Sequence, residues 1–340
     1  MENLNAMLFM LAKRMIFAPT LMVHGTEMGR VTEDTYLGDV ISADGKNNKT
    51  ISTRIAKGLG IITDIMNMLD KVKFGPHYFQ MALQLRERMF LNGILTNLDV
   101  WYGLTDNDVK QLEDLDLNLL RKILNTPFTV PPEAVYLELG CINIKTIIKA
   151  RRVNYLHYLI SQSENTMLSK FFTVQWKYSC KDDWTQQVKT DLEDFGILEN
   201  LEDIKAKSKS SFKKLVKVKA KEFAFYSYCE RNLSKLDSLF YTELKLQNYL
   251  KSDEISVKQG QTIFSYRTRM AAYSENYCGA TGPQACPVCG LHLDSQSMSF
   301  ECPVVKQNIT ITGKYTNIFK NCADSKLATT LIEIDKFRDE

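Results

Sequence analysis

The chain has 340 residues, and this length predicts about two domains. Hydrophobic residues make up 44% and charged residues 24%, a composition typical of a globular protein. It excludes extensive disorder, a collagen-like repeat and a small disulfide-stabilised fold. The 43 basic and 40 acidic residues give a net charge of +3, so any surface for nucleic acid has to be local.

No segment reaches the ~20 uninterrupted apolar residues that a membrane span needs. The best stretch, residues 6–23, is interrupted by Lys13, Arg14 and Pro19. The basic pair lies inside the apolar run rather than before it, which argues against a secretory signal, although a targeting peptide stays open. We expect an intracellular protein in a reducing compartment, with no membrane partner and no preference for nucleus or cytoplasm.

The first predicted elements are β-strands. Thr20–Val23 is a short apolar run, and a second run over Tyr36–Ile41 closes at the turn signal Asp44-Gly45. We predict a small hairpin or three-stranded patch within residues 20–48, after an unmatched segment over residues 1–19.

Helical periodicity begins near residue 50. Apolar residues from Ile51 to Leu69 recur at three- and four-residue steps, and Thr50 could cap this helix. Similar patterns predict a second helix over about 76–97 and a third that starts at Thr105. A short fourth helix should end at Gly140, and a fifth should cover 143–162. The apolar stripe of the third helix is Val109, Leu112, Leu115, Leu119 and Ile123, and its three leucines are expected to be core positions.

These helices are joined by short connections and therefore predict an antiparallel bundle over residues 49–165. The whole chain is expected to be mainly α-helical. Lys149, Arg151 and Arg152 cluster on the fifth helix, and either a solvated face or a phosphate-facing patch explains them.

Residues 166–260 are predicted to form a helical connector in which acidic and basic residues occupy separate segments. Residues 182–203 are acidic, whereas residues 205–221 contain eight lysines and no acid. Phe212, Leu215 and Phe223 give the lysine block partial helical spacing, and a further helix is predicted over 223–250. A lysine stripe that includes Lys213, Lys214 and Lys217 can neutralise phosphates without reading sequence; a solvated helix face is the alternative.

One motif carries metal chemistry, in the region 261–325 that precedes a tail over 326–340. Cys286-Pro-Val-Cys289 is a C-x2-C pair, and Cys302 follows thirteen residues later. Zinc takes four tetrahedral nitrogen or sulfur ligands, so three are present and the fourth is missing. Met298 stands where a histidine would complete the set, and thioether sulfur favours Cu(I) over zinc. Cys278 and His292 are the other candidates for the fourth ligand. A decayed site that no longer binds metal is the alternative.

No catalytic constellation stands out. The sequence has neither a phosphate-binding G-x-x-x-x-G-K-[ST] loop nor a dinucleotide-binding G-x-G-x-x-G motif. None of the four histidines forms a recognisable nucleophile–base arrangement. We expect a protein that is not an enzyme and has no catalytic cofactor.

Several segments, in order along the chain, are similar to one protein family. The segments Tyr36-Leu-Gly-Asp-Val-Ile-Ser-Ala-Asp-Gly45 and Ile51–Lys57 come first. They resemble the strand turn after the polymerase aspartates and the start of the thumb helix in non-LTR retrotransposon reverse transcriptases. Further similar segments are Leu91–Thr96, Val100–Leu104, Leu112–Leu124, Glu133–Gly140, Lys149–Arg152 and Phe264–Met270. The C-terminal similarity is Cys286–Cys289, Asp294–Gln296 and Cys302-Pro303.

This resemblance covers about residues 20–325. It implies a thumb and zinc-knuckle fragment, truncated or decayed, that grips the backbone of RNA or DNA and lacks the palm carboxylates that bind the two catalytic metal ions. The residues implied to contact nucleic acid are Tyr36, Leu37, Gly38, Lys149, Arg151, Arg152, Lys213, Lys214, Lys217, Arg267 and Arg269.

A structural zinc at Cys286, Cys289 and Cys302 is the implied cofactor, with an incomplete ligand set. The alternative function is a helical protein–protein interaction scaffold without a role in nucleic-acid binding. The sequence does not indicate an oligomeric state.

Overall fold

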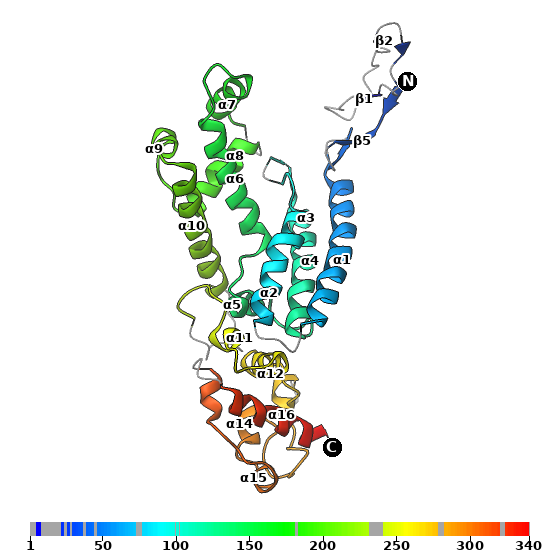
Figure 1. Ribbon diagram of the computed structural model, residues 1–340, viewed down its shortest axis with the longest axis vertical. Helices are drawn as coiled ribbons and strands as arrows, with labels where there is room; N and C mark the ends of the chain where they lie inside the picture. The colour runs from blue at the N-terminus through cyan, green and yellow to red at the C-terminus, as the bar shows by residue number, and fades with distance from the viewer. Residues whose placement is uncertain are drawn as a thin grey trace.

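The computed structural model describes most of the chain. The described residues are 5–7, 22–23, 26–27, 29–36, 39–43, 46–72, 77–98, 100–101, 103–180, 183–230, 241–277, 282–319 and 324–339. Within them the fold is mainly helical, as predicted. It is elongated, with the strands at one end and the C-terminal helices at the other (Figure 1).

Three short strand pairs form the N-terminal part. β1 (Asn5–Met7) runs parallel to β4 (Gly29–Val31), and β2 (Met22–Val23) pairs antiparallel with β3 (Thr26–Glu27). β5 (Glu33–Tyr36) and β6 (Asp39–Ser42) form an antiparallel hairpin, which lies within the predicted range 20–48 but pairs other segments than expected. The run that was predicted as one strand from Tyr36 to Ile41 is thus divided between two strands. The expected turn at Asp44-Gly45 lies outside the described residues.

The hairpin is fixed to the first helix, α1 (Asn48–Asp70), through Asp39. Its carboxylate pairs with the buried guanidinium of Arg54, and Asn97 donates to its second oxygen at 2.9 Å. Thr50 was expected to cap α1 but lies inside it, with its hydroxyl donating to the carbonyl of Val40 at 2.6 Å. The predicted cap is wrong because the N-cap position is Asn47, three residues earlier.

The predicted five-helix bundle is confirmed. After α1 come α2 (Tyr78–Leu85), which continues through a π-helical turn (Arg86–Leu91) into α3 (Asn92–Ile94), then α4 (Asp106–Leu124), α5 (Pro132–Leu139) and α6 (Ile144–Ile160). Thr105 and Asp108 form a reciprocal capping box at the start of α4. Leu112, Leu115 and Leu119 are all buried, as their spacing predicted.

A second hydrophobic cluster lies beside this bundle. It joins the C-terminal half of α6 to α7 (Met167–Lys177), α8 (Trp184–Asp194), α9 (Leu201–Ala206) and α10 (Lys209–Cys229). α10 is the predicted lysine-rich helix. Its buried side chains recur every fourth residue and are Phe212, Val216, Ala220, Ala224 and Tyr228.

The helix predicted over residues 223–250 is not continuous: residues 223–229 belong to α10, residues 231–240 lie outside the described residues, and residues 241–247 are not helical. α10 ends at Cys229, and residues near Leu246 instead form an isolated antiparallel bridge with Leu139 before the short α11 (Asn248–Lys251). Gly140 has a φ of +66°, and a Cβ atom there would lie 2.2 Å from the backbone nitrogen of Leu246. This close approach of two chain segments takes residues that have helix propensity into an extended conformation.

The C-terminal region continues the core of the bundle. It contains α12 (Val257–Arg267), α13 (Ser274–Tyr277), α14 (Gln296–Ser299), α15 (Pro303–Asn308), a 3-10 turn (Tyr315–Ile318) and α16 (Ser325–Asp339). α16 packs on α12 (Figure 1), and a single hydrophobic cluster extends from Ile51 in α1 to Ile334 in α16. No helix among the described residues is both long and apolar enough to cross a membrane.

Candidate functional site

The structure brings together the three predicted cysteines. The sulfur atoms of Cys286, Cys289 and Cys302 all lie within 4.8 Å of one another. Two sulfurs that share a tetrahedral zinc at about 2.3 Å are about 3.8 Å apart, so a small inward movement would suit a single ion. Cys286 and Cys302 are buried and Cys289 is partly exposed. The cluster could therefore hold a metal ion with three of its ligands.

A tight turn positions the C-x2-C pair. The isolated bridge between Ala285 and Leu293 closes it, and the backbone N–H of Cys286 donates to the carbonyl of His292 at 2.6 Å. Gly290 occupies the left-handed region with a φ of +67°, which suits glycine because it has no Cβ atom. Cys302 reaches the pair from the start of α15.

Backbone amides stabilise a thiolate at this turn. The N–H groups of Leu291 and His292 donate to the sulfur of Cys289 and bring its pKa down to about 7. Burial raises the pKa of Cys302, although the N–H groups of Val304 and Val305 donate to its sulfur. Because metals bind thiolates, the lowered pKa prepares Cys289 for metal binding near neutral pH.

A fourth ligand is not present in the described part of the cluster. Met298 lies on α14, next to a loop whose Ser295 hydroxyl accepts the N–H of Met298 at 3.1 Å. His292 does not belong to the group of convergent ligand atoms, and Cys278 lies outside the described residues. Among the described residues three thiols therefore converge, those of Cys286, Cys289 and Cys302, as the spacing predicted.

The predicted nucleic-acid residues fall into distinct groups. Lys213, Lys214 and Lys217 are exposed on α10, as a phosphate-binding stripe requires. Tyr36 ends β5, where only its backbone is described, and Leu37 and Gly38 lie outside the described residues.

The cluster on α6 needs a correction. Lys149 pairs with Asp191 and Asp194 of α8, and its side chain is only 12% exposed. Arg152 binds Asp191 through two hydrogen bonds of 2.7 and 3.0 Å. Both cations are neutralised by acids and tie α6 to α8, so the phosphate-facing interpretation is wrong for these two. Arg151 donates to the carbonyl of Leu95 and to the side-chain oxygen of Asn92, and it borders a groove.

Arg267 also needs a correction. Its side chain is 2% exposed and forms an ion pair of 2.9 Å with Glu138, which is fully buried. It therefore joins α12 to α5 and cannot reach a ligand at the surface. Arg269 is 29% exposed, lies 3.4 Å from a carboxylate oxygen of Glu275 and stacks over Phe319. It remains partly accessible but already has an acidic partner.

The groove that Arg151 borders lies between α6 and α10. Its volume is about 580 Å³, and its lining residues are Arg151, Asn154, Tyr155, His157, Tyr158, Lys209, Phe212 and Lys213. The described residues that line it include three cations and no acid. This groove was not expected from the sequence, because its two walls are about fifty residues apart along the chain.

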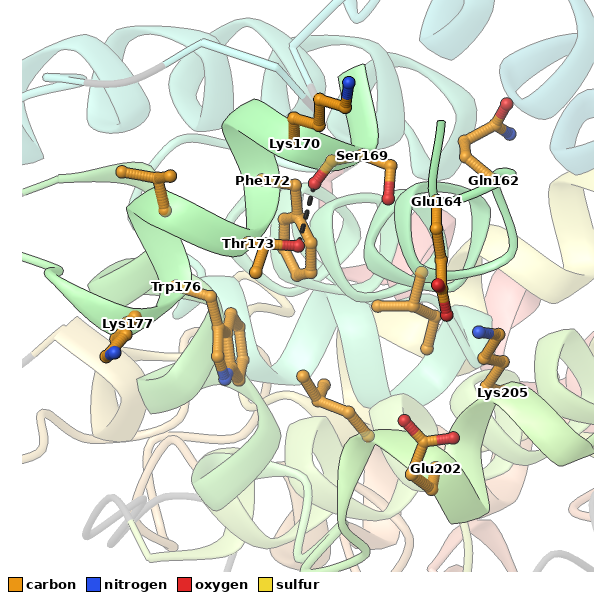
Figure 2. Close-up of a pocket in the computed structure, with 13 residues that line it drawn as sticks. Gln162, Glu164, Ser169, Lys170, Phe172, Thr173, Trp176, Lys177, Glu202 and Lys205 are labelled. Carbon is orange, nitrogen blue, oxygen red and sulfur yellow. Dashed lines mark hydrogen bonds between the residues drawn. The ribbon is translucent and has the colours of Figure 1, made fainter. Parts of the chain in front are cut away.

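A second hollow has a different character. It lies beside α7 and α9 and has a volume of about 670 Å³. Figure 2 shows that the carboxylates of Glu164 and Glu202 and the amine of Lys205 approach one another, while Phe172 and Trp176 supply an apolar wall. Charges of both signs in this hollow do not favour a polyanion. The basic groove and the exposed lysines of α10 are therefore the better surface for phosphates.

Comparisons with known proteins found no relative of this chain. No family model matches the chain, and neither the curated proteins nor the solved structures contain a significant match. Function therefore has to be argued from the site itself.

Proposed function

We propose that this protein binds the backbone of RNA or DNA, without catalysis, as the thumb and zinc-knuckle part of a non-LTR retrotransposon reverse transcriptase. The observation that carries the binding is the exposed lysine stripe of α10. Lys209, Lys213, Lys217 and Lys221 recur every fourth residue, and the last three each directly follow a buried residue of the helix. The stripe therefore runs alongside the packed face over three turns.

Most lysines of this stripe form no ion pair within the described part of the chain. Lys219 pairs with Glu222 and Lys207 with Glu199, whereas Lys209, Lys213 and Lys217 have no ion pair among the described residues. Free ammonium groups on a rigid helix can neutralise phosphates and release counterions. The stripe supports sequence-independent affinity.

The anchored hairpin supports the origin of the chain. The resemblance placed Asp39 in a strand turn and Arg54 at the start of a thumb helix, and these two side chains pair. The buried guanidinium also donates to the carbonyl of Gly93 at 3.1 Å, within another segment of the resemblance. Three similar segments thus meet at one contact, as parts of one ancestral thumb would.

The proposed metal is a structural zinc held by Cys286, Cys289 and Cys302. The backbone N–H groups that donate to the cysteine sulfurs support a thiolate site. A zinc ion there would crosslink the turn to α15 and stabilise the C-terminal region rather than act in chemistry.

A salt-titrated binding assay tests the proposed function. Fluorescence anisotropy with a labelled oligonucleotide should give an affinity that falls steeply with salt. The double variant Lys213→Ala/Lys217→Ala should lower the slope of log K against log salt by about 1.4 to 1.8, since each phosphate contact contributes about 0.7–0.9. Lys326→Ala, an exposed lysine on α16, is the matched control and should leave the slope unchanged. An unchanged slope in the double variant would contradict the proposal.

Absence of polymerisation is tested separately. The segments that carry the resemblance do not include the palm carboxylates, so primer–template, deoxynucleotides and magnesium should yield no extension. Extension that disappears when an aspartate of this chain is replaced would overturn this part of the proposal.

The interaction scaffold remains a second candidate, and one observation favours it. α7 exposes Met167, Phe171 and Val174, which are 69%, 67% and 58% accessible and lie on one side of the helix. Large exposed apolar side chains on one face are typical of protein contacts. If Phe171→Ser/Val174→Ser changes the sedimentation of the protein while the α10 variants do not change oligonucleotide affinity, the scaffold is the better account.

A further inference from the structure

Two tyrosines of α6 form a platform at the mouth of the basic groove. The rings of Tyr155 and Tyr158 are stacked, with centroids 5.6 Å apart and planes within 26° of each other. Trp184, which is buried, holds Tyr155 in an edge-to-face contact at 5.7 Å. Tyr158 is the outer ring, and 46% of it is exposed. Among the described residues Tyr155 is its single aromatic neighbour.

The floor of the groove is also held in place. His157 stacks on Phe212 of α10 with centroids 5.1 Å apart, and its Nε2 lies 2.9 Å from the carbonyl oxygen of Lys207. These contacts join the two helices that form the walls. The two walls of the groove are therefore held together by packed and hydrogen-bonded side chains.

Three cations line the same groove as the two tyrosines. Arg151 borders the groove from α6, and Lys209 and Lys213 border it from α10. Lys217 and Lys221 continue the same line along α10 beyond the groove. A phosphate chain that follows the lysines would thus pass directly beside an exposed aromatic ring.

We propose that this groove holds an unpaired base of a single-stranded nucleic acid, stacked on Tyr158, while Arg151, Lys209 and Lys213 hold the flanking phosphates. The inference rests on the proposed nucleic-acid binding and names its substrate class. Stacking on an aromatic side chain needs a free base face, which a continuous duplex does not offer away from its ends. The groove volume of about 580 Å³ is within the range of sites that enclose small ligands.

The test separates base stacking from charge. We would measure binding of the full chain to a labelled uridine 12-mer, to an abasic 12-mer with the same phosphates, and to a blunt hairpin duplex. The native protein should prefer the uridine strand over the abasic strand by about tenfold, the effect of one stacked base. Tyr158→Ala should remove this preference and leave abasic binding unchanged, whereas Tyr158→Phe should retain it.

Tyr226→Ala is the matched control, because Tyr226 is 64% exposed on α10 and does not line the groove. Equal affinity of the native chain for the uridine and abasic strands would overturn the inference, as would full retention of the preference in Tyr158→Ala. In both cases salt-dependent binding that depends on Lys217 would still support the proposed function. Absence of binding to all three probes at low salt would overturn both proposals.

Discussion

Glu138 and Arg267 are 129 residues apart in the chain and form an ion pair with a distance of 2.9 Å. Their side chains are 0% and 2% exposed. Tyr241 and Tyr249 donate to the two oxygens of Glu138 at 2.6 and 2.9 Å, so the carboxylate is fully paired. The pair lies where α5, residues 241–249 and α12 meet, and it joins the helical bundle to the C-terminal region.

The first prediction concerns this pair. Arg267→Met leaves the carboxylate of Glu138 buried without its cation, which typically costs about 3–5 kcal/mol. Urea unfolding of the full chain should show this loss. Glu301→Gln, which breaks an exposed pair with Lys306, should cost at most about 1 kcal/mol. A similar small loss for both variants would show that the buried pair contributes little to stability.

A second prediction uses two glycines of α1 that differ in their surroundings. A Cβ atom at Gly58 would lie 2.5 Å from Cδ2 of Leu115 on α4, whereas a Cβ atom at Gly60 would meet nothing within 4 Å. Gly58→Ala should therefore destabilise the protein by about 1–3 kcal/mol through overpacking. Gly60→Ala should stabilise it by up to about 1 kcal/mol, since alanine favours the helix.

The opposite signs of these two changes are the diagnostic result, measured as free energies of unfolding. Leu115→Ala should cost about 2–5 kcal/mol. Gly58→Ala in the Leu115→Ala background should then lose most of its penalty, because the clashing atom is gone. A penalty that persists there would show that Gly58 is required for another reason.

The third prediction concerns the metal. A neutral thioether binds zinc more weakly than imidazole, so Met298→His should complete a tetrahedral set and raise zinc affinity above that of the native chain. Competition with a chromophoric chelator measures this. Cys289→Ser should abolish tight binding in both backgrounds, and Cys180→Ser, an exposed cysteine outside the cluster, should not change it. Equal affinity with and without the histidine would mean that another residue already supplies the fourth ligand.

A fourth prediction is a pH dependence at the start of α8. Partial burial raises the pKa of Asp183, but hydrogen bonds from the Thr185 hydroxyl and the N–H groups of Gln186 and Cys180 outweigh it and lower the pKa overall. Stability from this cap is thus present above the unfolded pKa of about 3.9 and is lost as pH falls through the lower folded value. Asp183→Ala should cost about 0.5–2 kcal/mol at neutral pH and less in acid.

Ser208→Ala removes the neutral cap of α10 and is the matched control. Its cost should stay constant between pH 7 and pH 3, as measured by urea unfolding at each pH. A constant cost for Asp183→Ala as well would contradict the role of its charge.

Local patterns were sufficient for much of the helical architecture. The leucine stripe of α4 and the helix start at Thr105 depend on residues within one or two turns, so the sequence determined them directly. The same holds for the turn of Cys286 and Cys289, since a C-x2-C pair closes over four residues. These predictions were confirmed because their physical causes are local.

Only the tertiary structure decided which cations remain without an acidic partner. Lys149, Arg152 and Arg267 resembled available cations in the sequence, but their acidic partners lie 39 to 129 residues away and pair with them once the helices pack. The lysines of α10 stay exposed because no acidic helix packs over that face among the described elements. The stacked tyrosines join those lysines in one groove only through the contact of α6 with α10. Burial and pairing depend on which elements meet, and a sequence pattern within one helix does not contain that information.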